Sequence, residues 1–417
     1  MNKNLFYWLL YDAGNSFVVS AIGGLYLSQW LVLDKGIPEI WYGTAFSVAT
    51  VFVLLTSPLF GAWSDKLDNR KVFVNIFTLI IAIAGLLMIF STNSREVSSF
   101  LPIFVLFLFF LIQYSYQLSL VFFNSLLEKL SFENTRGKIS GLSMLFNQVA
   151  FVLANAALLP FALGKVTLVG VTGRSQVFLP AFIIFAVLSS PFVFRFKENK
   201  KRGEQIKNKG QGIFSRTLEG IKLLYRKEKN VGIFLLGFSF VSDALLTISL
   251  YFALILNELY KVSDVKKFIA LSIMFIFAAI GGYWAGKIAD KRGVKKTLLL
   301  MATCVMISFF IAFLSTNFFI LLVVLVFAGI GWGGFYSLSR VMLVKISPSE
   351  QLGEYFGFYS TFERFASIIG PTLWAITITL LVHNSMLKYR VAGFSQITLM
   401  IIGIIILLRV KDKRIIS

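Results

Sequence analysis

The sequence contains few of the residues on which secreted, metal-binding or soluble proteins depend. Its one cysteine, Cys304, allows neither an internal disulfide nor a cysteine-pair metal site. It has one histidine, and only 14% of its 417 residues are charged, whereas a soluble protein has about a quarter. No Gly-x-x-x-x-Gly-Lys-Ser/Thr nucleotide loop and no His-Glu-x-x-His motif occurs. We therefore expect neither an ATP-driven pump nor a metalloprotease, nor any other enzyme, and no cofactor or metal.

Long apolar runs take the place of these motifs. The chain is 57% hydrophobic and 16% aromatic, and a bilayer core about 30 Å thick needs roughly 20 apolar residues per helix. The first run does not have the short apolar core and small-residue cleavage site of a secretory signal peptide. We therefore expect it to remain in the protein as the first transmembrane helix. The sequence predicts an all-α membrane protein with twelve transmembrane helices, over 5–33, 40–63, 72–91, 100–128, 138–164, 176–196, 231–257, 267–289, 297–315, 317–345, 354–382 and 389–410.

The net charge of +20 follows the predicted topology. With the N-terminus in the cytoplasm, roughly three quarters of the lysines and arginines fall in cytoplasmic segments, as the positive-inside rule requires. The basic excess therefore indicates orientation and affinity for anionic lipid rather than a nucleic-acid partner. We expect a multi-pass protein of the cell membrane with both termini in the cytoplasm.

The longest polar interval divides the predicted helices into two sets of six. It covers 197–230 and predicts a cytoplasmic linker between a bundle over 1–196 and a bundle over 231–417. The first part of the linker is highly charged and therefore solvated. In its second part, residues 213–224 can place apolar side chains on one helical face, which fits an amphipathic helix on the membrane surface. An extension of the seventh helix into the cytoplasm fits equally well.

Two segments of the first half recur in the second. GAWSDKLDNRK, residues 61–71, matches GKIADKRGVKK, residues 286–296, at one constant offset. TRGKISGLSMLFNQ likewise matches QLGEYFGFYSTFER through two glycines in each copy. A parallel internal repeat of six helices is the plan of many secondary transporters.

The duplicated Gly-x-x-x-Asp-Lys resembles the signature loop of the major facilitator superfamily, and the resemblance covers nearly the whole chain. The first copy departs from the pattern with Asp68 in place of a glycine, and the second with Val294 in place of a base. LLYDAGNSF, VFFNSLLEKLSFENTRGKISG, YSLSRVMLVKISP and GEYFGFYSTFERFASIIGP resemble the branch of fungal vacuolar amino-acid effluxers and their uncharacterised prokaryotic relatives. This implies a pseudo-twofold pair of bundles, with helices one, four, seven and ten lining a cavity and an amino acid as substrate.

Three acids and two bases lie well inside predicted helices. Each costs about 2.5–3.5 kcal/mol at membrane depth on insertion scales, so such residues are usually paired or face water. Asp243 is nearer the membrane midplane than Asp12, and either can bind a proton or a substrate ammonium. The competing interpretation is a hydrogen bond that locks two helices together. The candidate substrate- or proton-binding residues are Asp12, Asn15, Gln113, Gln117, Asn124, Asn147, Asp243, Arg340, Glu363 and Arg364.

Glu363 and Arg364 are consecutive, so on a helix they point about 100° apart and cannot simply pair. At least one must reach another helix or a cavity. Arg340 and Arg364 are candidates to hold a substrate carboxylate in a bidentate contact, although Arg340 is also close enough to the cytoplasmic end of its helix to extend to water.

The duplicated motif supplies candidate gating residues. A carboxylate near the N-terminus of a neighbouring helix would stabilise one closed state through the helix dipole. The candidates are Gly61, Asp65, Arg70, Gly286, Asp290 and Lys291.

Two functions remain open from the sequence. One is a secondary transporter that moves a small polar solute, an amino acid or a similar metabolite, by alternating access with proton coupling. The other is a transporter-shaped sensor or lipid-handling protein that moves no solute. The expected partners are a small-molecule substrate, protons and membrane lipid, and we expect a monomer.

Overall fold

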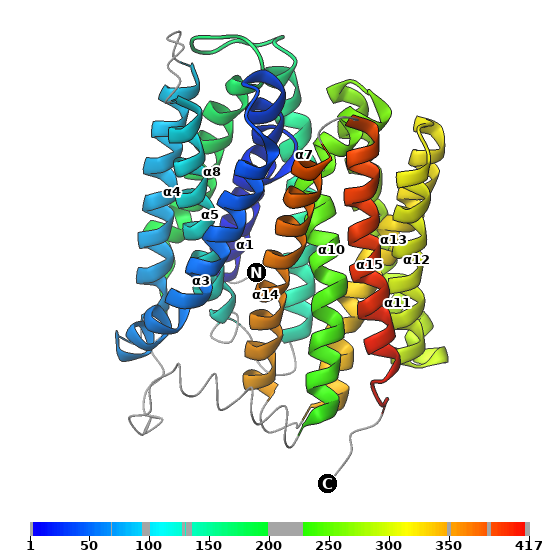
Figure 1. Ribbon diagram of the computed structural model, residues 1–417. Coiled ribbons are helices and arrows are strands. Elements are labelled where there is room, and N and C mark those ends of the chain that lie inside the picture. The colour runs from blue at the N-terminus through cyan, green and yellow to red at the C-terminus, as the bar shows by residue number, and fades with distance from the viewer. Residues whose placement is uncertain are drawn as a thin grey trace. The chain divides into compact units, whose positions relative to one another are not determined.

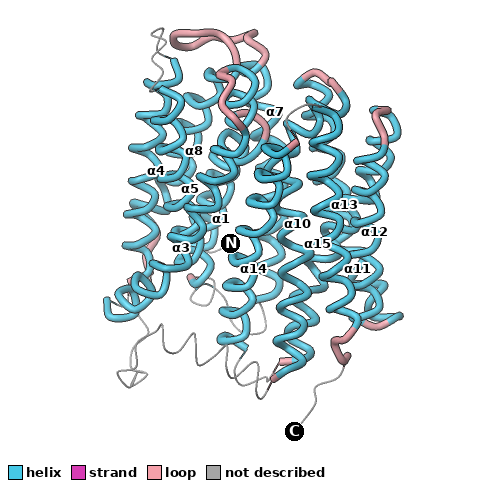
Figure 2. Tube along the Cα trace, in the orientation of Figure 1, coloured by secondary structure: helices cyan, strands magenta, loops and turns pink. Residues whose placement is uncertain are grey.

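The computed structural model describes residues 3–67, 69–93, 101–126, 130, 136–198, 228–347, 352–381 and 385–412. Within these residues every regular element is helical (Figure 2). The chain forms two compact units, Met1–Phe214 and Ser215–Ser417. Figure 1 labels most of the helices of each unit. Residues 199–227, which include the predicted amphipathic helix, lie outside the described part.

Among its described residues, the first unit contains six long helices. The aromatic side chains Trp8, Tyr11, Phe73 and Phe123 are buried between them, and Trp8 stacks on Phe123 at 4.7 Å between ring centroids. The helices are α1 (Lys3–Val19), α3 (Glu39–Leu67), α4 (Arg70–Asn93), α5 (Leu101–Ser125), α7 (Arg136–Ala162) and α8 (Phe178–Arg195).

The first predicted helix is not continuous. After α1 the chain passes through a π-helical turn, η1 (Ser20–Gly24), a short α2 (Leu27–Gln29) and a second π-helical turn, η2 (Trp30–Asp34). The adjacent glycines Gly23 and Gly24 are weak helix formers, which explains why the regular hydrogen bonding fails there.

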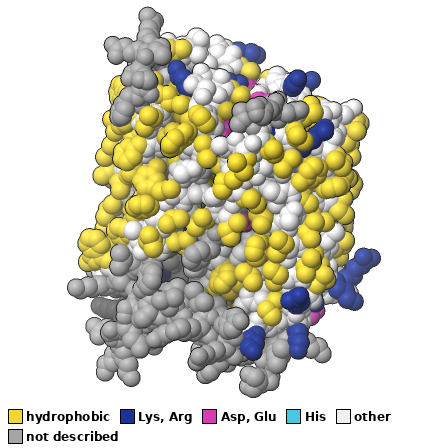
Figure 3. All heavy atoms as spheres, in the orientation of Figure 1, with side chains coloured by type: hydrophobic (Ala, Val, Ile, Leu, Met, Phe, Trp, Pro, Cys, Tyr) yellow, Lys and Arg dark blue, Asp and Glu magenta, His cyan; other side chains and the backbone are white. Residues whose placement is uncertain are grey.

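The described part of the second unit also contains six long helices. They are α10 (Lys229–Tyr260), α11 (Asp264–Arg292), α12 (Val294–Leu314), α13 (Phe318–Ile346), α14 (Leu352–Leu380) and α15 (Ser385–Leu408). With those of the first unit they make the twelve that the apolar runs predict. Among the described residues, ten helices are long and apolar enough to cross a membrane. In Figure 3 the described side chains along the visible face are mostly apolar, and lysines and arginines lie toward its ends.

Glycines bring α11 and α13 into direct contact. A Cβ atom at Gly333 would lie 1.8 Å from the carbonyl oxygen of Ala278, and one at Gly329 would lie 2.3 Å from that of Met274. No side chain can fit at either position. Small residues spaced four apart are the usual means by which membrane helices pack closely.

Both units hold the end of their sixth helix in the same way. In the first unit, the Asn4 side chain donates to the Lys197 carbonyl at 2.9 Å and accepts from the Lys197 amide at 3.2 Å. In the second, Asn230 makes the same two bonds to Lys411, at 2.9 and 2.7 Å. In each unit, a lysine of the third helix adds one more hydrogen bond at this helix end. The Lys71 side chain donates to the Phe196 carbonyl, and the Lys295 side chain donates to the Leu408 carbonyl. The internal repeat is therefore visible in side-chain contacts as well as in sequence.

These paired bonds lead to a stability prediction. We expect Asn4→Ala and Asn230→Ala each to lower the melting temperature of the purified protein by a few degrees, because each loses two hydrogen bonds of about 1 kcal/mol. Thermal unfolding in detergent measures this. Asn124→Ala, at an exposed amide on α5, is the control. Equal shifts in all three variants would show that the paired bonds contribute no more stability than an exposed amide does.

Candidate functional site

Asp12 connects the first and fifth helices of the first unit. Its side chain is 7% exposed, and its Oδ1 accepts a hydrogen bond from the Asn147 side chain on α7 at 3.0 Å. One turn along α1, the Ser16 hydroxyl donates to the Asn147 carbonyl at 3.2 Å. Asn147 is therefore bonded to α1 through both its side chain and its main chain.

The other polar candidates of the first unit differ in their surroundings. Asn15 is fully buried beside Asp12. Gln113 and Gln117 are also buried, and Gln117 donates to the Thr50 hydroxyl on α3 at 3.0 Å. Asn124 is exposed. The structure thus brings Asp12 and Asn147 together, while Gln117 contacts a third helix and Asn124 has an exposed side chain.

Asp243 makes the corresponding connection in the second unit. It is 1% exposed on α10, and its Oδ2 accepts the backbone N–H of Gly370 on α14 at 2.7 Å. Within the described residues, its Oδ1 and the Thr247 hydroxyl one turn later have no hydrogen-bond partner. One carboxylate oxygen of Asp243 thus joins α10 to α14. The other is buried without a hydrogen-bond donor in the described structure.

The local sequence of α14 explains this contact. A Cβ atom at residue 370 would lie 2.2 Å from the Thr247 hydroxyl and 2.7 Å from Asp243 Oδ1, so only glycine fits. Pro371 follows inside the helix and has no N–H to donate. The Gly370 carbonyl accepts from the Gln396 side chain of α15 at 3.3 Å. Three helices therefore meet at a point where α14 departs from regular hydrogen bonding.

The two buried acids occupy equivalent places. Each lies on the first helix of its unit and accepts a hydrogen bond from the fifth, through a side-chain amide in one unit and a backbone amide in the other. A carboxylate that accepts from N–H is a strong, charge-assisted acceptor, and protonation weakens it. Adding or removing a proton at either acid therefore changes how tightly these two helices are joined.

A charged cluster lies on α13 and α14 of the second unit. Arg340 on α13 and Glu363 and Arg364 on α14 are all half-buried. The Tyr359 hydroxyl is bonded to the Ser339 hydroxyl at 2.8 Å, and its ring stacks on Phe238 of α10 at 4.3 Å between centroids. The buried Tyr336 ring meets Phe238 edge-on at 6.2 Å between centroids. Aromatic contacts therefore join α13 and α14 to α10, the helix that carries Asp243.

The duplicated motif lies on helices rather than in loops. The helix α3 continues to Leu67 and α11 to Arg292, so Gly286, Asp290 and Lys291 occupy the last two turns of α11. Asp290 and Lys291 are exposed. Arg70 donates to the Ser125 carbonyl at the end of α5 at 2.8 Å. The surroundings of Gly61 and the side chain of Asp65 are not among the described parts, and the gating role of all six positions stays a prediction.

Sequence reasoning missed three residues with clear roles. Gly370 and Gln396 complete the surroundings of Asp243, and a Gly-Pro pair inside an apolar run was the available signal. Lys267 is 1% exposed near the start of α11 and binds Asp264 Oδ1 at 3.0 Å and Asn257 Oδ1 at 3.1 Å. The i,i+3 spacing of Asp264 and Lys267 could have indicated that pair.

Comparison with known proteins agrees with this architecture. The model of the Major Facilitator Superfamily matches residues 12–292 and 269–415. The uncharacterized MFS-type transporter YxiO of Bacillus subtilis (strain 168) is 26% identical over 428 aligned positions, covering 97% of this chain and 94% of YxiO.

Two solved structures share the fold at low identity. The nucleoside transporter NupG superposes with a TM-score of 0.73 at 14% identity, over 98% of both chains. A D-xylose–proton symporter superposes with a TM-score of 0.72 at 14% identity, over 99% of both chains. At this identity the likeness concerns the fold alone.

Proposed function

We propose, from the premise that this chain belongs to the Major Facilitator Superfamily, that it is a proton-coupled secondary transporter of a small polar solute. The family makes it a membrane transporter rather than an enzyme. Proton coupling, the substrate and the cell membrane as its location are our proposals. The branch of amino-acid effluxers to which four segments show resemblance stays a hypothesis.

One observation carries the proton coupling: a buried acid joins the first helix to the fifth in both units. Asp243 supports it most strongly, because Oδ2 holds the Gly370 amide while Oδ1 has no partner in the described structure. A side chain that is 1% exposed and packed against a glycine has room for a proton but not for a substrate ammonium. We therefore assign Asp243 to the proton, and Asp12 as its counterpart.

The substrate assignment depends on the charged cluster. Arg340 on α13 and Glu363 and Arg364 on α14 are half-buried and offer both signs of charge, as a zwitterion would require. We place amino acids first among small polar solutes for this reason. Nucleosides and pentoses, the solutes named for the structural neighbours, are the alternatives.

The proposed orientation predicts a labelling pattern. In a Cys304→Ser background, a cysteine at Lys209 should be shielded from a membrane-impermeant maleimide in intact cells, and one at Val169 should react. Val169 is 49% exposed, whereas the nearby Arg174 is held in an ion pair with Asp34. Reaction of both positions from the same side would contradict the topology.

Ligand screening and uptake test the proposed function. Thermal shift of the purified protein against amino acids, nucleosides and pentoses should identify a class that stabilises it, by about 2.7 kcal/mol at 100 times its Kd. Vesicles containing the protein should then take up that solute faster than protein-free vesicles. A solute that stabilises the protein but is not taken up by the vesicles would favour the alternative, a sensor that moves no solute.

A further inference from the structure

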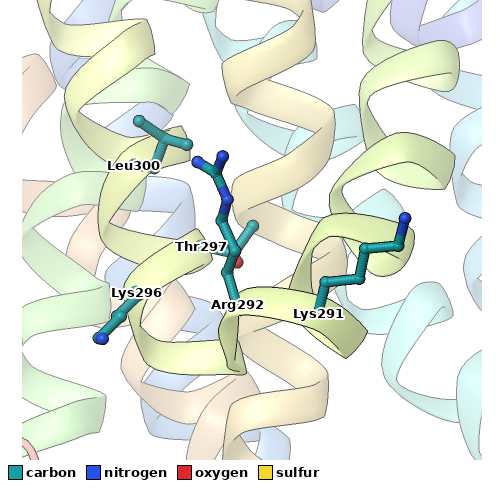
Figure 4. Close-up of a pocket in the computed structure, with 5 residues that line it drawn as sticks. All are labelled: Lys291, Arg292, Lys296, Thr297 and Leu300. Atoms are coloured by element: carbon teal, nitrogen blue, oxygen red, sulfur yellow. The ribbon is translucent and has the colours of Figure 1, made fainter.

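A basic hollow lies where α11 ends and α12 begins. It has a volume of about 450 Å³ and is lined by Lys291, Arg292, Lys296, Thr297 and Leu300, without an acidic residue. Gly293, with φ +88°, makes the turn between the two helices. Figure 4 shows Arg292 extending along the hollow toward Leu300, with Thr297 beside it, whereas Lys291 and Lys296 extend outward on either side.

These three cations differ from nearby basic residues. Lys295 donates to the Leu408 carbonyl, and Lys287 lies over the rings of Tyr283 and Trp284. In the first unit, Arg70 and Lys71 at the start of α4 likewise donate to helix-end carbonyls. Across the described part of the chain, no hydrogen bond or ion pair of Lys291, Arg292 or Lys296 is found. Asp412, the acid near Gly293, is paired with Lys345. Three exposed positive charges around one concave site therefore suit an anion.

The surroundings of the hollow indicate where that anion comes from. Leu300 forms one wall and is 48% exposed, and Ile307 continues the same apolar surface two turns along α12 at 47%. On α11, Tyr283 and Trp284 are 64% and 55% exposed, two turns before Lys291. Exposed aromatic residues next to basic ones mark the level of the lipid headgroups. A ligand here would have its charge at the hollow and an apolar portion along α12.

We propose that this hollow binds the phosphate headgroup of an anionic phospholipid, with the acyl chains lying along α11 and α12. Arg292 supplies the planar, multiple-donor contact that suits phosphate, and the two lysines supply flexible charges on either side. Basic pockets between membrane helices on the cytoplasmic side are suited to such headgroups. The site is separate from Asp243 and its test does not depend on transport.

Titration with short-chain lipids tests the assignment. Dioctanoyl-phosphatidylglycerol, dioctanoyl-phosphatidylcholine and inorganic phosphate are each added to the purified full-length protein in neutral detergent, and melting temperature is recorded. We expect phosphatidylglycerol to raise it at lower concentration than either of the others. The variant K291Q/R292Q/K296Q should weaken this effect at least tenfold. Arg292→Gln alone, which changes one exposed side chain, should weaken it severalfold.

A second triple variant controls for net charge. R195Q/K197Q/K229Q removes three exposed basic side chains at helix ends outside the hollow, and it should bind within twofold of the wild type. Equal weakening by the two triple variants would show that only overall charge matters. Stabilisation by inorganic phosphate equal to that by phosphatidylglycerol would show a free-anion site. Either result would overturn the proposal.

Discussion

Asp243→Asn should abolish accumulation of solute driven by a pH gradient while leaving solute exchange measurable. Asparagine has nearly the same shape, and its carbonyl oxygen can still accept the Gly370 amide that Asp243 Oδ2 accepts at 2.7 Å. Its NH₂ group can donate to the Thr247 hydroxyl, which has no partner in the described structure. The fold is therefore retained, but the side chain can no longer bind and release a proton. Uptake into vesicles, with and without an imposed gradient, measures the effect.

A matched carboxylate elsewhere on α10 provides the control. Glu258 is half-buried near the end of the same helix, where it accepts from Asn257 at 3.1 Å. We expect Glu258→Gln to accumulate solute within twofold of the wild type. Wild-type accumulation by Asp243→Asn at equal protein levels would instead make Asp243 a residue that only joins α10 to α14.

Gly370→Ala should impair both folding and transport. The added Cβ atom would lie 2.2 Å from the Thr247 hydroxyl and 2.7 Å from Asp243 Oδ1. The helices must separate or the side chains must leave their rotamers, and overpacking of this kind costs about 1–3 kcal/mol. Because the displaced atoms include the proposed proton site, we expect coupled uptake to fall at least tenfold. Melting temperature and uptake are measured on the same preparation.

Gly357 on the same helix is the matched position. A Cβ atom there meets nothing within 4 Å, so Gly357→Ala should leave uptake unchanged and, by favouring the helix, should not lower stability. If Gly370→Ala transports like Gly357→Ala, the close contact between α10 and α14 is not needed in the transport cycle.

Much of the fold could be predicted because membrane helices are encoded locally. An apolar run long enough for the bilayer identifies its own helix, so the twelve runs and the polar interval after Phe196 anticipated the twelve helices. The sequence did not predict where a helix becomes irregular or where it ends. The π-helical turns after Val19 are not visible in hydropathy, and neither is the extension of α11 through Lys291 to Arg292.

The candidate site was predictable in composition but not in pairing. An acid inside an apolar run is conspicuous, so Asp12, Asp243 and Glu363 could be selected from the sequence alone. Their partners could not be, because helix rotation and depth decide which side chains meet. The partner of Asp243 is a backbone amide, which every residue except proline carries. The equivalent placement of Asp12 and Asp243 becomes visible only when the hydrogen-bond partner of each is known.

Proton movement during solute transport tests the central claim most directly. Vesicles containing the wild-type protein and a trapped pH-sensitive dye are exposed to the solute that the thermal-shift screen identifies. We predict a change of internal pH that requires the solute and disappears in Asp243→Asn, while that variant still exchanges labelled for unlabelled solute. Solute flux that moves no protons, and that is equal in Asp243→Asn and the wild type, would contradict proton coupling through Asp243.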